Sequence, residues 1–170
     1  VLFVNRQSGQ LDDYNRTFGA DVNFQFFTDL KFNAVLAKTV TPGRRGEDGM
    51  ATVDMKWQNN IFRLLGSYSD IQKNFNPEVG SVRRTGRKII HAEVGISSRL
   101  QQESNVGSLI RDIFPLLVAD YTVLPSGETE VKLLRPQLEI KLQDGGGFGT
   151  HYAQNFKRAD RRPCGIRLPA

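Results

Sequence analysis

The stretch YNRTFGADVNFQF, residues 14–26, decides the fold class of this chain. Its even positions are apolar, with Arg16 as the one exception, and its odd positions are polar or glycine. Successive side chains of a β-strand point to opposite faces of a sheet. This alternation therefore predicts a long strand with one apolar face and one polar face.

The same period of two recurs along the chain. Regular alternation covers 51–58, 90–97, 134–143 and 148–156, and less regular strands fit 32–40, 62–69 and 116–123. The opening residues, VLFVNR, also have the character of a strand. Turn signals separate the strands, namely TDL at 28–30, NN at 59–60, PSGE at 125–128 and QDGGG at 143–147. The pattern predicts an all-β, antiparallel, up-and-down meander of about eight or nine strands.

Two stretches depart from this pattern. Pro136 lies inside an alternating run, and its missing N–H predicts a bulge or a locally broken ladder. The segment SLIRDIF, residues 108–114, is the one stretch that could form a helical turn or two.

Composition restricts the possible functions. The 170 residues include 23 Lys and Arg against 18 Asp and Glu, and the basic residues are spread thinly. Because a nucleic-acid interface needs a dense basic stripe with aromatic residues for stacking, we do not expect nucleic-acid binding. The single cysteine, Cys164, excludes an internal disulfide and a cysteine-based zinc site. The chain has no apolar run long enough for a transmembrane helix and no signal peptide at its start, and we expect it to be a fragment of a longer protein.

Two architectures use an alternating meander. A soluble β-sandwich turns its apolar face toward a second sheet, whereas a transmembrane β-barrel turns it toward lipid. Three features favour a segment of a barrel: strands of about 10 to 13 residues, a mixture of short and long connections, and aromatic residues near strand ends. These features leave the sandwich as the alternative fold.

The stretch GSYSDIQKNFNPEVGSVRRTGRK, residues 66–88, resembles the signature of a known family. The family consists of bacterial outer-membrane β-barrel proteins, whose barrel is a domain of unknown function that usually follows a family-nine-type carbohydrate-binding module. The matching positions are Tyr68, Asp70, Phe75, Asn76, Pro77, Glu78, Val79, Gly80, Val82, Arg84 and Thr85. Ser81 departs from the pattern where an aromatic residue is usual, and the tail with Arg161 and Cys164 follows it only loosely.

The resemblance implies a role for the whole chain. Residues 1–170 would form one segment of a larger barrel in the bacterial outer membrane. Its partners would be membrane lipid, an oligosaccharide or other small ligand, the rest of its own barrel and an N-terminal carbohydrate-binding-like module. Its function would be the binding or passage of sugar-derived or polymeric nutrients, with no cofactor. The polar positions expected to face the lumen are Asp21, Asn23, Gln25, Asp54, Lys56, Glu93, Glu139 and Lys141.

The loop at 75–86 has two interpretations. Pro77 restricts Asn76 to extended conformations, Gly80 can adopt a positive φ, and Glu78 is near enough in sequence to pair with Arg83 or Arg84. The first interpretation is a structural loop that caps or plugs the rim of the barrel. The second is a site for an anionic or sugar ligand, because bidentate arginine suits carboxylates and phosphates. The residues of that candidate site are Asn76, Pro77, Glu78, Gly80, Arg83 and Arg84.

Catalytic patterns are weak. His91 and Glu93 share the polar positions of one predicted strand, and His151 lies on a distant one. These three residues are the candidates of a second alternative, a membrane-associated hydrolase, and they form only a weak zinc set. Because the chain has no Gly-x-Ser-x-Gly elbow and no calcium-loop spacing, we expect neither an enzyme nor a metal site.

Overall fold

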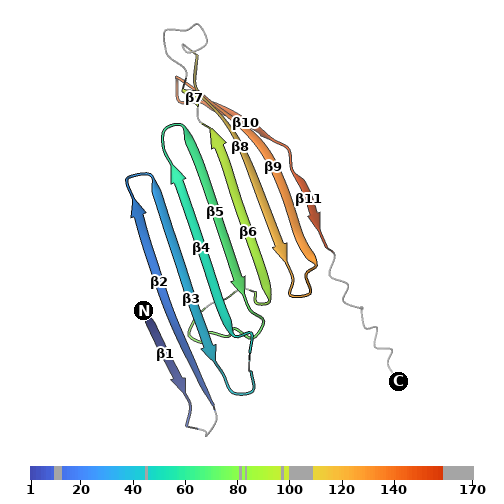
Figure 1. Cartoon of the computed structure of the whole chain (residues 1–170). Coiled ribbons are helices and arrows are strands. Elements are labelled where there is room, and N and C mark those ends of the chain that lie inside the picture. Colours follow the sequence, from blue (N-terminus) through green and yellow to red (C-terminus); the bar gives the residue numbers. More distant parts are fainter. Residues whose placement is uncertain are drawn as a thin grey trace, which may run out of the picture.

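The computed structural model describes residues 1–9, 13–44, 46–80, 82, 84–96, 98–99 and 109–158. These residues contain eleven strands and no helix, and the strands form one open antiparallel sheet (Figure 1). The strands pair in the order β1-β2-β3-β4-β5-β6-β8-β9-β10, while β7 pairs with β8 and β11 pairs with β9. The predicted all-β antiparallel meander is confirmed.

The strand boundaries agree closely with the alternation in the sequence. The first five strands are β1 (Leu2–Gln7), β2 (Tyr14–Phe26), β3 (Leu30–Val40), β4 (Gly49–Gln58) and β5 (Phe62–Ile71). The remaining six are β6 (Arg87–Ile96), β7 (Ser98–Arg99), β8 (Ile110–Val123), β9 (Thr129–Leu142), β10 (Gly147–His151) and β11 (Gln154–Lys157).

Two local predictions had different outcomes. The helical turn expected in 108–114 was wrong, because Ile110–Phe114 belong to β8, and Ser108 lies outside the described residues. The broken ladder at Pro136 is confirmed. β10 ends where His151 pairs with Gln137, β11 begins where Gln154 pairs with Leu134, and the Pro136 carbonyl between them accepts a hydrogen bond from Tyr152 N. The residue without an N–H thus separates two short strands that would otherwise be continuous.

The register gives the sheet one apolar face and one polar face. Directly paired residues share a face, and one such row contains Val22, Ala34, Val53, Tyr68 and Ile90. The polar row beside it contains Asn23, Asn33, Asp54, Ser67, His91 and Asp120. All eight polar residues named above as lumen-facing lie on the polar face of this register.

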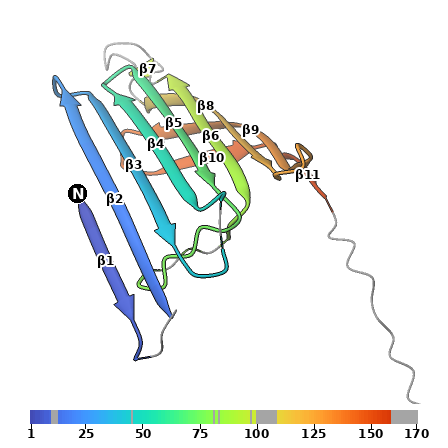
Figure 2. The ribbon, with the colours of Figure 1, turned by 60° about the horizontal axis from the view of Figure 1, so that its bottom comes forward.

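The apolar face of the sheet is not covered, and buried polar side chains occur where the β5–β6 connection lies over the polar face. The apolar face is open, with Phe18 47%, Phe24 53% and Trp57 41% exposed. The most buried polar side chains instead lie on the polar face, where Asn15 and Thr39 are 2% and 1% exposed. The sheet is also strongly twisted, so that β8–β10 run at a steep angle to β2–β5 (Figure 2).

A small apolar cluster interrupts the polar face at β8. Leu116 and Val118 are 8% and 1% exposed, and they pair with Gly95 and Glu93 of β6. Gly95 leaves the space that these side chains use, because a Cβ there would lie 2.8 Å from Phe114 Cζ and 2.9 Å from Leu116 Cδ1. A glycine near the end of β6 thus permits close packing across the sheet.

Candidate functional site

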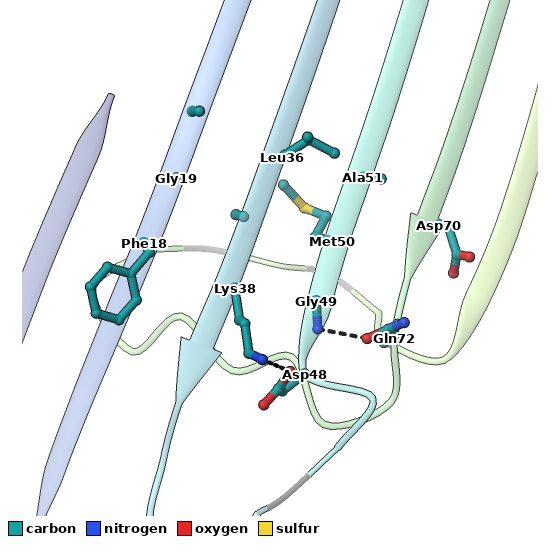
Figure 3. Close-up of a pocket in the computed structure, with 12 residues that line it drawn as sticks. Phe18, Gly19, Leu36, Lys38, Asp48, Gly49, Met50, Ala51, Asp70 and Gln72 are labelled. Carbon is teal, nitrogen blue, oxygen red and sulfur yellow. Dashed lines mark hydrogen bonds and ion pairs between the residues drawn. The ribbon is translucent and has the colours of Figure 1, made fainter.

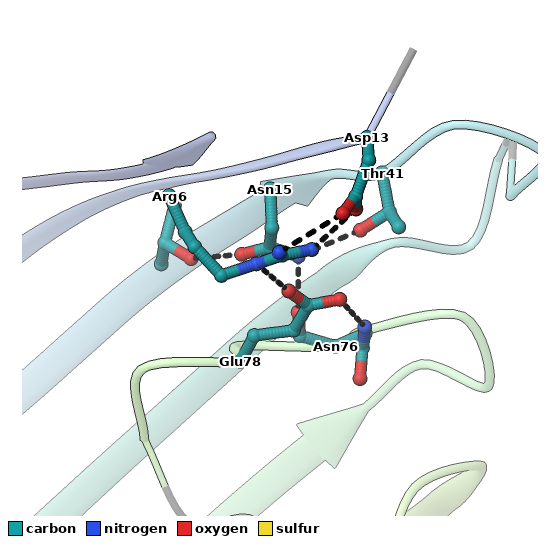
Figure 4. A network of polar contacts seen from close by, with 7 residues as sticks. Arg6, Asp13, Asn15, Thr41, Asn76 and Glu78 are labelled. Carbon is teal, nitrogen blue, oxygen red and sulfur yellow. Dashed lines mark hydrogen bonds and ion pairs between the residues drawn. The ribbon is translucent and has the colours of Figure 1, made fainter. Parts of the chain in front are cut away.

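The connection between β5 and β6 folds back across the polar face of the sheet. We call its described residues 72–80, 82 and 84–86 the strap. Phe75 of the strap is only 3% exposed, and the backbone N–H of Asn76 donates a hydrogen bond to Thr39 Oγ1 at 3.0 Å. The strap therefore rests on the ends of β2 and β3, where the sheet carries its buried polar residues (Figure 4).

Asn15 joins the strap to the sheet. Its Nδ2 donates hydrogen bonds of 2.8 Å to the Asn76 carbonyl and to Thr41 Oγ1. Its Oδ1 accepts a hydrogen bond from Thr17 Oγ1 at 3.4 Å. A buried amide must find partners inside the protein, and the backbone of the strap supplies one of them.

An ion-pair network fixes the acidic residue of the strap. Glu78 pairs with Arg6 of β1, and Arg6 Nη2 lies 2.6 Å from Asp13 Oδ1 (Figure 4). Hydrogen bonds from Arg6 and then Ser8 lower the pKa of Asp13 below its ordinary value. The sequence suggested Arg83 or Arg84 as the partner of Glu78. The described partner is Arg6, which is 72 positions away, and Arg83 lies outside the described residues.

The other end of the strap is attached to β9. Glu130 Oε1 lies 3.7 Å from Arg84 Nη1 of the strap and 3.0 Å from Nη2 of Arg87, the first residue of β6. Since β1 and β9 are far apart in the strand order, the strap links distant parts of the sheet. Sequence reasoning missed both Arg6 and Glu130, because each is an ordinary charged residue in a region with no motif.

The β3–β4 connection contacts the strap through two hydrogen bonds and one ion pair. Asn74 N donates to the Glu47 carbonyl at 2.8 Å, Asn74 Nδ2 donates to the Gly46 carbonyl at 2.7 Å, and Lys73 Nζ lies 2.8 Å from Glu47 Oε2. Gly80, which can adopt a positive φ, does not do so in the strap. The strap adopts a positive φ at Gly86 instead, with a value of 68°, where the chain enters β6.

The structure brings most of the predicted loop-site residues into one folded unit. The charges of Glu78 and Arg84 both face partners within the protein, and Gly80 lies beside Pro77. This arrangement favours the structural interpretation of the loop. Ligand binding by these residues stays a prediction.

A second polar network lies in the middle of the sheet, on the polar face. Arg63 contacts Glu93 at 2.8 and 3.1 Å, while His91 Nδ1 lies 2.6 Å from Asp120 Oδ1. His91 Nε2 lies 3.3 Å from Glu93 Oε1. We call Arg63, Glu93, His91 and Asp120 the cross-strand network.

The cross-strand network bears on the hydrolase alternative. Both ring nitrogens of His91 face carboxylates, so neither is directed to a nucleophile. His151 pairs with Gln137 in the β9–β10 ladder and has no described contact with His91. No group of three metal-ligating side chains suited to a metal ion occurs among the described residues.

Comparisons with known proteins found no match to a family model, a curated protein or a solved structure. The family resemblance of the 66–88 stretch therefore stays a prediction. Within the described part of the chain, no helix is long and apolar enough to span a membrane.

Proposed function

We propose that this chain is a segment of a bacterial outer-membrane β-barrel. Its apolar face would contact lipid, its polar face would line the lumen, and the strap would lie across one end of that lumen. The uncovered apolar face of the sheet carries this proposal. A soluble sandwich would cover Phe18, Phe24 and Trp57, whereas these side chains are 41 to 53% exposed.

Strand dimensions support the same conclusion. β2 has 13 residues, and β8 and β9 have 14 each. A tilted strand needs about 9 to 11 residues to cross the hydrocarbon core. Strands of globular sheets are commonly about 5 or 6 residues long. The observed lengths suit a membrane crossing with a short extension on either side.

The open edges require further strands. β1 and the β10–β11 pair each have a side with no described neighbour in the sheet. Unpaired backbone groups are very costly in lipid, so a spanning sheet must close on itself. We propose that other parts of the same barrel pair with these two edges.

The nutrient-related role rests on the family resemblance. We propose that the barrel takes part in the binding or passage of sugar-derived or polymeric nutrients, with carbohydrate recognition in an N-terminal module. The mixed charges of the polar face suit a hydrated and partly blocked lumen, because acidic and basic side chains alternate there with amides.

Refolding in plain buffer and in detergent micelles tests the proposal. Far-UV circular dichroism reports β-structure, and gel mobility with and without boiling reports a compact barrel-like form. We expect β-structure to form in detergent and not in buffer, and a heat-modifiable band to appear when the strands that pair with the two open edges are also present. A folded soluble monomer in buffer would overturn the barrel and restore the sandwich.

Two neighbouring substitutions sharpen this experiment. Val22 and Asn23 are adjacent in β2 but lie on opposite faces. A lysine facing the bilayer midplane costs about 2 to 4 kcal/mol, and a lumen-facing lysine costs little. We expect Val22→Lys to reduce folding in detergent and Asn23→Lys to leave it unchanged. Equal tolerance of both substitutions would show that the apolar face does not contact lipid.

A further inference from the structure

Among described residues with register partners, charge on the apolar face occurs at one end of the sheet. The charged residues that have register partners on this face are Arg16, Lys38, Asp70, Lys88 and Lys132. Each lies within four residues of the strand end nearest the strap, in β2, β3, β5, β6 and β9. We call the four cations, Arg16, Lys38, Lys88 and Lys132, the basic row.

The other end of the apolar face is aromatic. Phe24, Phe26, Trp57 and Phe62 lie there, each 41 to 53% exposed, and no charged residue pairs on this face at that end within the described strands. Contact with water over the whole face would not favour this separation of charged and aromatic residues. A face that extends from the hydrocarbon core of a membrane to its charged headgroup region would favour it.

The cations of the basic row can still donate hydrogen bonds to a ligand. Lys38 Nζ lies 3.6 Å from Asp48 Oδ1 and Lys88 Nζ lies 3.7 Å from Asp70 Oδ2, and these lysine side chains are 64% and 57% exposed. Each contact occupies at most one of the three ammonium donors. Lys132 is exposed and has no ion pair with a described residue, and Arg16 stacks over the Tyr14 ring at 4.9 Å.

A shallow groove of 570 Å³ lies at this end of the sheet. Small and aliphatic residues line it, among them Ala20, Leu36 and Ala51, with Phe18 at its side. Lys38, Asp48 and Gln72 lie toward the strand ends (Figure 3). The apolar walls suit a lipid chain, and Lys38 lies at the polar end of the groove together with the carboxylates of Asp48 and Asp70.

We propose that the basic row binds the phosphodiester groups of anionic phospholipids, with an acyl chain along the groove. This inference rests on the proposed barrel, and it places the strap end of the sheet at a membrane–water boundary. Tyr14, Tyr68 and Tyr121 lie on the same face within the same half of the sheet. Tyrosine is enriched at such boundaries, where its ring is apolar and its hydroxyl is hydrated.

The experiment compares two triple variants of equal charge. The test variant is K38Q/K88Q/K132Q, on the apolar face, and the control is K31Q/K56Q/K141Q, on the polar face. Each chain is refolded in neutral detergent and titrated with phosphatidylglycerol or phosphatidylcholine. Native mass spectrometry then measures the bound lipid.

We expect the unmodified chain and the control to prefer phosphatidylglycerol, and the test variant to lose about tenfold or more of that preference. Equal loss in both triple variants would overturn the site, because only net charge would then matter. Competition by inorganic phosphate beyond that of chloride at equal ionic strength would also overturn it, in favour of a free-phosphate site.

The two proposals fail in distinguishable ways. If every chain folds in detergent and none distinguishes the two lipids, the phospholipid site is wrong while the barrel stands. If the unmodified chain folds in buffer without detergent, the barrel is wrong and the phospholipid site falls with it.

Discussion

The two polar networks of this sheet are built on different principles. The cross-strand network joins residues of neighbouring strands in register, as with His91 and Asp120, or residues two apart in one strand, as with His91 and Glu93. The strap network joins residues 61 and 72 positions apart, as with Asn15 and Asn76 and with Arg6 and Glu78. The first network follows from strand pairing alone. The second network requires the strap to fold onto strands that have already paired.

This difference has an energetic consequence. Residues of the cross-strand network are held in place by backbone ladders on both sides, and its His91 and Asp120 side chains are about one-third exposed. The strap has few ladder bonds and depends on buried contacts at Phe75 and Asn15. Substitutions in the strap contacts should therefore detach a whole segment, whereas substitutions in the sheet should act locally.

The largest effect is expected for Phe75→Ala. This side chain is 3% exposed, and truncating a buried phenylalanine costs about 3 to 5 kcal/mol. Urea unfolding of the chain in detergent measures the free energy of unfolding. The control is Phe27→Ala in the β2–β3 turn, where the ring is 92% exposed and the change should stay within about 0.5 kcal/mol. Equal effects of the two variants would mean that the strap does not anchor through Phe75.

A smaller effect is expected for Asn15→Ala. The substitution removes both hydrogen bonds of Nδ2 and leaves the Asn76 carbonyl without that donor, at a cost of about 1 to 3 kcal/mol. Hydrogen exchange of the strap amides should increase together with the loss of stability. Asn23→Ala, on the same strand and face but exposed, should leave the exchange of the strap unchanged. Unaltered strap exchange in the Asn15 variant would separate this residue from the strap.

Gly95→Ala tests the packing between strands of the sheet, outside the strap. The new Cβ would lie 2.8 Å from Phe114 and 2.9 Å from Leu116, and such overpacking costs about 1 to 3 kcal/mol. Gly66→Ala, on the neighbouring strand, meets no atom within 4 Å and should be tolerated. We expect the Gly95 variant to leave strap exchange intact. Faster exchange in the strap would show that the two regions are coupled.

The sequence predicted the strands and the faces because both depend on local alternation. β2 occupies 14–26 as expected, and polar residues such as Asp54 and Glu93 share one face. The break at Pro136 was predictable for the same reason, because the missing N–H of proline removes a ladder hydrogen bond at that residue.

The strap contacts were not predictable in this way. Nothing near Arg6 or Glu130 indicates that each would meet a loop from the middle of the chain. Arg83 and Arg84 follow Glu78 closely in sequence and were reasonable partners for it. The described partner of Glu78 is Arg6, and Arg84 pairs with Glu130. The positive φ of the strap likewise lies at Gly86 and not at Gly80, because the chain turns where it enters β6.

The smallest effect, and the most specific, concerns the pKa of Asp13. Hydrogen bonds from Arg6 and Ser8 lower this pKa below its ordinary value near 3.9. Because the folded pKa is depressed, the stabilising contribution is present above the unfolded pKa and is lost as the pH falls through the lower folded value. Carboxyl NMR of labelled aspartate should show this depression. Arg6→Gln should return the pKa toward its ordinary value, while Arg63→Gln in the cross-strand network should leave it low. An Asp13 that titrates ordinarily in the unmodified chain would remove Arg6 as the link between β1, Asp13 and the strap.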